Sequence, residues 1–354
     1  MKLQKLGWNQ FFDSEFRLYE DEGYSVGRIA LEHKRMYRVI TEEGEILAEV
    51  SGRLRFHAEG RGDYPAVGDW VVMQVRADEG RGTIHHILPR MSKFSRKVAG
   101  AEIEEQIVAA NIDTIFLVMA LNADFNSRRL ERYLLTAWES GANPVIVLSK
   151  ADLCDDIDEK VKEAESIALG VPIHVISAEQ NTGLEKLSIY MGEGQTVALL
   201  GSSGVGKSTL VNAFLGTEKL KTSGIRQGDD KGRHTTTHRE LIVLEQGGIL
   251  IDTPGMRELQ LWEADTGLSA GFSDVDQLGD QCKFRDCQHN GEPGCAIERA
   301  LNEGTLDFAR YESYLKLQKE LAYLDRKENK QKSMAEKERW KKITVDHRKR
   351  KKGR

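Results

Sequence analysis

The sequence of 354 residues has no apolar run that approaches the roughly 20 residues needed to cross a bilayer. Its N-terminus, MKLQKLGWNQFF, interrupts apolar residues with polar ones and has no signal-peptide pattern. These two absences exclude a membrane-spanning chain and predict a cytoplasmic protein without a membrane partner. The length allows a sizeable core and about two or three domains.

Cysteine is scarce, with four residues in the whole chain. Cys154 stands alone, whereas Cys282, Cys287, His289 and Cys295 follow the spacing C-x4-C-x-H-x5-C. Without a secretory signal, such a cluster favours a metal site over disulfides. Three thiolates and one imidazole form the closed tetrahedral set of structural zinc, with no open position for catalysis. The alternative is three free thiols that lie near a histidine by chance.

Acidic residues outnumber basic ones in most of the chain, which has 51 Lys or Arg, 56 Asp or Glu and a net charge of -5. The segment from Lys330 to Arg354 is the exception, with twelve Lys or Arg and three Asp or Glu residues. An acidic body with a basic tail indicates a polyanionic partner that the tail contacts. A solvated tail that keeps the protein soluble fits the composition equally well.

Short alternating runs separated by Gly-rich turns extend from Gly23 to about Pro89. Stretches such as RIALEHKRMYRVIT and DYPAVGDWVVMQV each have the pattern of a strand or a strand pair. About five short strands in so few residues predict a small antiparallel barrel, for which the oligonucleotide-binding (OB) barrel is the commonest solution. Another small β module remains an alternative.

From Thr114 the pattern changes to alternating strands and helices. TIFLVMA is a continuous apolar run, as expected for a strand buried on both faces, and SRRLERYLLTAWESG is an amphipathic helix. Further buried strands are predicted at PVIVL, PIHVIS, TVALL and GILIDT. This alternation predicts a doubly wound, mostly parallel α/β sheet over residues 105–265. Charged sequence with helical spacing follows the cysteine cluster.

The stretch GSSGVGKS matches the phosphate-loop pattern G-x-x-x-x-G-K-[ST] in full, between a predicted strand and a predicted helix. In such a loop Gly201 and Gly206 let backbone N–H groups surround a phosphate, while Lys207 reaches the outer phosphates. The Ser208 hydroxyl is a ligand for Mg²⁺. The predicted phosphate-binding residues are Gly201, Ser202, Ser203, Gly204, Val205, Gly206, Lys207, Ser208 and Thr209.

The stretch ILIDTPG, from Ile249 to Gly255, ends another buried strand with an acidic residue. We expect Asp252 to hold Mg²⁺ through water and the Gly255 N–H to meet the γ-phosphate. The preceding polar segment contains Thr235, Thr236 and Thr237. One of these threonines, with Thr236 as the candidate, would contact Mg²⁺ and the γ-phosphate.

The stretch SKAD, which follows the strand PVIVL, has the pattern [NTS]-K-x-D that reads guanine. The Asp152 carboxylate can accept hydrogen bonds from guanine N1–H and N2–H₂, and adenine lacks this pair of donors. Lys150 can lie over the base, and Ser149 replaces the usual Asn. The next strand ends in Ser177 and Ala178, where a backbone N–H can meet guanine O6. The predicted base-binding residues are Ser149, Lys150, Ala151, Asp152, Ser177 and Ala178.

The order of these motifs is unusual, because SKAD precedes the phosphate loop along the chain. Sheet neighbours need not be consecutive in sequence, and rearrangement is tolerated where the old termini lay close together. We therefore predict a circularly permuted GTPase domain. In this order the DTPG strand lies near the C-terminal end of the domain, so the cysteine cluster directly follows the segment that senses the γ-phosphate.

Together, YPAVGDWV, SKAD, GSSGVGKST, GRHTTTH, DTPG and the Cys₃His cluster resemble the ribosome small-subunit-dependent GTPase A (RsgA) family over residues 25–325. The resemblance implies an N-terminal OB barrel, a permuted GTPase and a C-terminal zinc domain. It also implies action late in small-subunit maturation, with GTP hydrolysis stimulated by that subunit. The expected divisions are an N-terminal extension (1–30), an RNA-binding barrel (31–95), the GTPase domain (105–265), a helical zinc domain (268–330) and a basic tail (331–354).

The predicted activity is hydrolysis of GTP to GDP and phosphate with Mg²⁺, by a monomer that binds the small ribosomal subunit and its rRNA. Many GTPases orient the attacking water with a Gln just after DxxG, but Met256 stands there. We therefore expect slow intrinsic turnover, with His234 as the candidate to orient water and His238 as second choice. Either histidine is otherwise a solvated loop residue. The alternative function is an RNA-binding assembly factor in which GTP only sets affinity and turnover is incidental.

Overall fold

The computed structural model describes residues 2–33, 35–98, 104–122, 125–216, 239–245, 247–252, 271–289, 291–308, 310–319 and 322. The chain forms two compact units. One consists of Met1–Arg96 with Gln106–Glu263, and the other of Lys97–Glu105 with Ala264–Arg354. Among the helices so described, none is both long and apolar enough to span a membrane.

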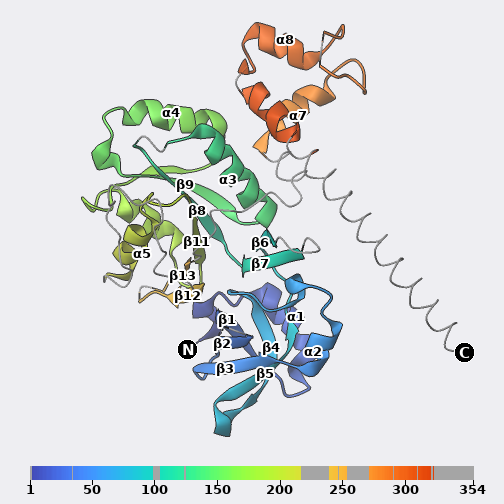
Figure 1. Ribbon diagram of the computed structural model, residues 1–354, viewed down its shortest axis with the longest axis vertical. Helices are drawn as coiled ribbons and strands as arrows, with labels where there is room; N and C mark the ends of the chain where they lie inside the picture. Colours follow the sequence, from blue (N-terminus) through green and yellow to red (C-terminus); the bar gives the residue numbers. More distant parts are fainter. Residues whose placement is uncertain are drawn as a thin grey trace, which may run out of the picture. The chain divides into compact units, whose positions relative to one another are not determined.

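Five strands of the first unit close into a barrel (Figure 1). They are β1 (Ser25–His33), β2 (Met36–Ile40), β3 (Glu45–Val50), β4 (Trp70–Arg76) and β5 (Arg81–Ile87). The order is β1-β2-β3-β5-β4, with β4 returning to β1, and only the β3–β5 pair is parallel. The barrel also carries the short helices α2 (Gly52–His57), η2 (Arg61–Asp63) and η3 (Ala77–Glu79). The predicted small barrel is therefore confirmed.

The barrel begins before residue 31, because the first part of β1 is needed to close it. Ser25 to Arg28 pair with Met73 to Trp70 of β4. The preceding segment, η1 (Leu3–Leu6) and α1 (Gln10–Glu20), packs on the same strand through aromatic contacts. The ring centroids of Trp8 and Trp70 lie 4.8 Å apart.

A fully buried arginine joins this N-terminal segment to the rest of the unit. Arg28 donates hydrogen bonds to the carbonyl oxygens of Leu6, Gly68 and Asn111 and to Thr196 Oγ1. Burial lowers the pKa of Arg28 to about 10, while Asp113 and Asp69 oppose that shift. Because a buried cation is tolerated only when its donors are satisfied, Arg28 fixes these segments relative to one another.

The second part of the first unit is an α/β sheet with helices on both faces (Figure 1). Its parallel strands lie in the order β10 (Ile173–Val175), β9 (Asn143–Ser149), β8 (Thr114–Ala120), β11 (Thr196–Leu200) and β13 (Ile249–Asp252). Strand β12 (Glu240–Val243) is antiparallel to β13. Helices α3 (Ser127–Ser140) and α4 (Ile157–Ile167) share one apolar cluster with the sheet, whereas η5 (Leu184–Tyr190) and α5 (Lys207–Leu215) share another.

The path of the chain through this sheet is the predicted circular permutation. The chain enters at β8, crosses to β9 and β10, and only then forms β11 on the other side of β8. It ends at β13, which pairs with the free side of β11. Strand β12 also pairs with β1 of the barrel, so barrel and sheet form one continuous set of 11 strands. Strands β6 (Lys93–Val98) and β7 (Glu104–Ala110) form a separate pair.

The described part of the second unit is helical and small. It contains α7 (Ser273–Asp280), α8 (Ala296–Glu303) and a further helical stretch at residues 310–319. Arg310 joins that stretch to α7 through two 2.7 Å contacts with the Asp274 carboxylate, and it lies 4.8 Å from the Phe272 ring centroid. The described residues of this unit include nine buried apolar ones, a small core for which a bound metal adds stability.

Candidate nucleotide site and metal centre

The predicted nucleotide residues gather at one edge of the parallel sheet. Strands β9, β10, β11 and β13 run in the same direction. Their carboxyl ends carry, in that order, SKAD, Ser177 with Ala178, the phosphate loop and Asp252. This edge is where ligands bind in open α/β sheets. Motifs that are distant and permuted along the chain therefore meet in space.

The phosphate loop connects β11 to α5 and lies close against β8. A Cβ on Gly201 would stand 2.4 Å from the Val118 carbonyl oxygen, so no larger residue fits there. Gly206 has φ 98° and caps α5, which turns the loop into the helix N-terminus. Lys207 Nζ donates to the carbonyl oxygens of Gly201 and Ser202 at 2.7 and 2.6 Å. The ammonium group is thereby held inside the loop.

Two side-chain contacts that the motifs did not predict support the phosphate loop. Ser149 Oγ donates to the Val205 carbonyl oxygen at 2.6 Å, which links the guanine-reading motif to the loop. Arg129 Nη1 on α3 donates to Ser202 Oγ at 3.1 Å. The Ser149 contact explains a polar residue at the end of an apolar strand. No local sequence pattern predicts the contact between Arg129 and Ser202, because these residues are 73 positions apart in the chain.

A pocket of about 260 Å³ lies between SKAD, the end of β10 and the phosphate loop. Lys150, at the start of η4 (Ala151–Leu153), has φ 60° and lines the pocket together with Asp152 and Ala178. Ser177, which is fully buried, donates its hydroxyl hydrogen to Asp152 Oδ1. The Ala151 N–H donates to the Ile176 carbonyl at 3.1 Å. The two predicted base-reading segments, SKAD and the end of β10, are thus joined by hydrogen bonds.

The hydrogen bond from Ser149 to the Val205 carbonyl predicts a loss of GTP affinity when the hydroxyl is removed. In Ser149→Ala the Val205 carbonyl loses its donor, and GTP affinity is expected to fall about three- to tenfold. Titration with a fluorescent GTP analogue measures this. Ser166→Ala is a matched control, because the Ser166 hydroxyl is exposed and bonds only within its own helix, to the Glu163 carbonyl. Equal affinity of Ser149→Ala and wild type would contradict the role.

The predicted magnesium residues lie at adjacent strand ends. Asp252 ends β13, and Ser208 is in the first turn of α5, after neighbouring β11. The pKa of Asp252 is raised above its usual value. Burial is the main cause, the nearby Lys207 opposes the shift, and Glu240 adds to it. A carboxylate and a hydroxyl are oxygen donors of the kind that Mg²⁺ prefers, so the donor set fits this ion.

Several predicted catalytic residues fall outside the described residues. These are His234 and Thr236, with the alternatives Thr235, Thr237 and His238. Gly255, the predicted γ-phosphate contact, and Met256 also lie outside the described residues. Their predicted roles stay predictions.

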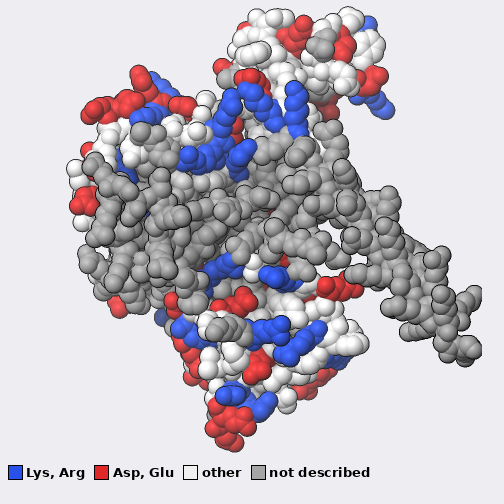
Figure 2. Space-filling view, viewed as in Figure 1, with Lys and Arg blue, Asp and Glu red and all other residues white. Residues whose placement is uncertain are grey.

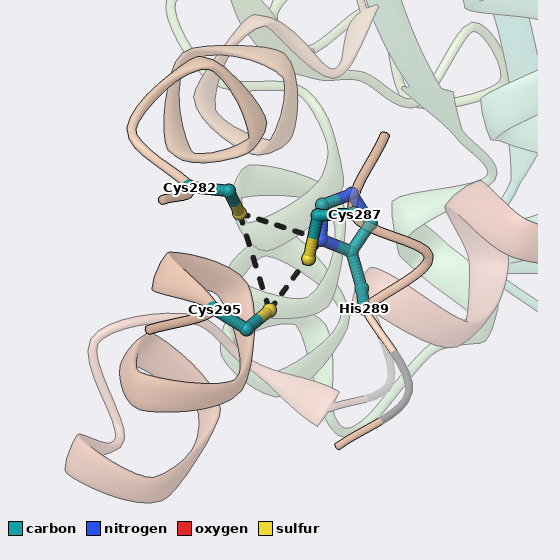
Figure 3. Close-up of side chains that lie close together, drawn as sticks. All are labelled: Cys282, Cys287, His289 and Cys295. Carbon is teal, nitrogen blue, oxygen red and sulfur yellow. Dashed lines mark hydrogen bonds between the residues drawn. The ribbon is translucent and has the colours of Figure 1, made fainter. Parts of the chain in front are cut away.

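The four predicted zinc ligands converge on one point (Figure 3). The ligand atoms of Cys282, Cys287, His289 and Cys295 all lie within 4.8 Å of one another. Cys282 Sγ and Cys295 Sγ are 4.0 Å apart, and His289 Nδ1 lies 3.5 and 3.4 Å from them. A tetrahedral zinc site with Zn–S of about 2.3 Å requires S–S edges of about 3.8 Å and slightly shorter S–N edges. The cluster therefore fits zinc.

Backbone groups at the start of α8 favour the thiolate form of Cys282. The N–H groups of Ala296 and Glu298 donate to the sulfurs of Cys282 and Cys295 at 3.3 and 3.4 Å. Burial alone would raise the pKa of Cys282, but the N–H groups of Ala296 and Ile297 contribute to a net lowering. His289 has φ 55°, an uncommon conformation that points its ring into the cluster.

Comparison with known proteins places these features in one family. The family model described as RsgA GTPase matches residues 87–262. A relative from Oceanobacillus iheyensis, named small ribosomal subunit biogenesis GTPase RsgA 1, is 48% identical over 332 residues, which is 94% of this chain and 95% of that protein. The chain belongs to the RsgA GTPase family. An RsgA from Opitutus terrae is 45% identical and covers 97% of this chain and 96% of its own.

Solved RsgA-type structures have the same fold. YjeQ from Thermotoga maritima superposes with a TM-score of 0.63 at 30% identity, over 84% of this chain and 99% of that chain. YloQ, described as a circularly permuted GTPase, gives 0.60 at 24% identity over 84% and 95%. A model described as ABC transporter also matches residues 184–344, a range that includes the phosphate loop, which many nucleotide-binding proteins share.

Membership in the RsgA family confirms two predictions. The protein has the permuted GTPase fold with a barrel and a Cys₃His cluster that could bind zinc. It is also a GTP hydrolase that uses guanine nucleotide.

Proposed function

We propose that the protein is a monomeric, cytoplasmic GTPase that binds the small ribosomal subunit late in maturation, with hydrolysis stimulated by that subunit. One observation carries the proposal. RsgA relatives named small ribosomal subunit biogenesis GTPases match this chain at 48% and 45% identity over nearly their whole length.

The proposed division of labour follows the geometry of the nucleotide site. Asp152, oriented by Ser177, accepts hydrogen bonds from the guanine edge in the pocket beside Lys150. The phosphate loop surrounds the phosphates, and Lys207 stabilises the negative charge that develops on them. Ser208 and Asp252 would hold Mg²⁺, which neutralises charge between the outer phosphates when bound.

The barrel is the proposed contact to rRNA. A groove of about 540 Å³ on its surface is lined by Arg53, His57 and His86, among others. Beside it the Phe56 ring is 86% exposed, as suits a base-stacking platform. Figure 2 shows Lys and Arg side chains near α2 on the visible barrel face, among scattered acidic ones. Cations with an exposed aromatic ring are a typical combination for single-stranded RNA.

The deciding experiment is single-turnover GTP hydrolysis with and without purified small subunits. The proposal predicts that small subunits accelerate the chemical step at least about tenfold, because Met256 cannot orient water and the intrinsic rate is slow. Large subunits are the control. If subunits bind in a GTP-dependent way but leave the rate unchanged, the alternative holds, in which GTP only sets affinity.

His234 is the proposed group that orients the attacking water. His234→Ala is expected to keep GTP affinity and to lose most of the stimulated rate, a decrease of about tenfold or more. His33→Ala, in the barrel strand β1, provides a control histidine. Full stimulation in His234→Ala would rule out this role and leave His238 as the candidate.

A further inference from the structure

A row of opposed residues crosses the junction between the barrel and the GTPase sheet. Arg38 of β2 pairs with Leu31 of β1, Leu31 pairs with Glu240 of β12, and Glu240 pairs with Asp252 of β13. All three pairings are antiparallel, and directly opposed residues in antiparallel strands project from the same face of the sheet. The side chains of Arg38, Glu240 and Asp252 therefore lie on one face, in one line.

Within this row Arg38 reaches over Leu31 to form an ion pair with Glu240. Arg38 Nη2 donates to Glu240 Oε1 across the junction. Arg38 Nε also lies 3.7 Å from Oε2 of Glu45, which belongs to the neighbouring barrel strand β3. The side chains of Arg38 and Glu240 are 31% and 40% exposed, so this pair contributes little to folding stability. The ion pair does, however, fix the position of the Glu240 carboxylate.

Glu240 is placed where an unpaired carboxylate would disturb the nucleotide site. Opposed residues of antiparallel strands have Cβ atoms about 4.5–5.5 Å apart, so Glu240 is within reach of the groups around Asp252. Two carboxylates at that separation repel one another and compete for a cation. The ion pair with Arg38 draws the Glu240 carboxylate toward the barrel instead.

We infer that Arg38, a residue of the barrel, is a positioning residue for GTP hydrolysis, because it holds the Glu240 carboxylate away from Asp252. The inference rests on the proposed magnesium role of Asp252 and is independent of any ribosomal partner. It assigns to the barrel a part in the chemistry of the GTPase sheet. Glu240 is also only two residues beyond His238 in the sequence, at the end of the segment that contains the candidate switch threonines.

The test is steady-state GTP hydrolysis by the full chain across a Mg²⁺ titration. In Arg38→Ala, kcat is expected to fall about three- to tenfold, while KM for GTP stays within about twofold of wild type. KM is spared because Arg38 touches neither the base pocket nor the phosphate loop. The Mg²⁺ concentration for half-maximal rate is expected to fall about twofold, because the released Glu240 carboxylate attracts the cation.

Matched variants separate positioning from loss of structure. Arg38→Lys keeps the charge and should retain a kcat within about twofold of wild type. Arg38→Ala combined with Glu240→Gln should regain most of the rate, because the unpaired anion is gone. Glu45→Gln removes the other partner of Arg38, within the barrel, and should leave the kinetics unchanged. If Arg38→Ala is poorly folded by thermal unfolding, Arg38→Gln replaces it in the same comparison.

Two results would overturn the inference. One is wild-type kcat and Mg²⁺ dependence in Arg38→Ala. The other is an additive loss when Glu240→Gln is combined with it. Asp252→Asn is measured in parallel, and Mg²⁺-dependent turnover equal to wild type in that variant would refute the proposed role of Asp252 itself. A failure of the Arg38 inference is thereby distinguishable from a failure of the magnesium site.

Discussion

Replacing Asp152 by Asn is expected to lower GTP affinity about a hundredfold and to raise affinity for xanthosine triphosphate. In the proposed guanine site, the Asp152 carboxylate would accept hydrogen bonds from guanine N1–H and N2–H₂. Ser177 donates to Asp152 Oδ1, so an amide in this place would keep its oxygen toward Ser177 and turn its NH₂ group to the base. That NH₂ opposes the guanine donors, whereas the xanthine ring offers a carbonyl at C2 that accepts from it.

The measurement is competition of GTP, xanthosine triphosphate and ATP against a fluorescent guanine nucleotide. Asp155→Asn is the matched control, since Asp155 is an exposed carboxylate three positions along the chain that does not line the pocket. An Asp152→Asn variant that still prefers GTP over xanthosine triphosphate would show that the base is read elsewhere. Equal competition by ATP in wild type would show that the site does not distinguish guanine from adenine, and would also contradict the role of Asp152.

Removing the metal from the Cys₃His cluster should unfold the second unit. A structural zinc site contributes on the order of 10 kcal/mol or more to folding at neutral pH. The few buried apolar side chains around α7 and α8 cannot replace that amount. In Cys295→Ser, which removes the most buried ligand but leaves a side chain that can still cap α8, we expect loss of bound zinc and rapid proteolysis of this unit.

The first unit has its own core, so GTP affinity of Cys295→Ser should stay within about twofold of wild type. Zinc per chain by elemental mass spectrometry and limited proteolysis provide the two readouts. Cys154→Ser serves as the control, because Cys154 lies outside the cluster. A zinc-free protein with an undiminished protease-resistant C-terminal fragment would contradict a structural metal.

Much of the fold was predictable because its elements carry local patterns. The continuous apolar run TIFLVMA became β8, buried along its whole length, and Gly141 ends α3 in the left-handed conformation expected of a terminating glycine. The barrel boundary was less accurate, since the start of β1 is specified by its pairing with β4. The packing of the N-terminal segment on Trp70 was not predicted at all, because only distant residues show where its aromatic rings go.

The chemistry of this protein was predictable from short stretches of its sequence. Phosphate loop, guanine reader and zinc ligands lie in short motifs, where a few neighbouring residues hold all the required donor and acceptor atoms. The contacts that connect those motifs became visible with the folded chain. Ser149 binds the Val205 carbonyl, Arg129 binds Ser202, and Arg38 of the barrel reaches Glu240, 202 positions away. Such contacts depend on strand order and register, which long-range packing sets and no local pattern encodes.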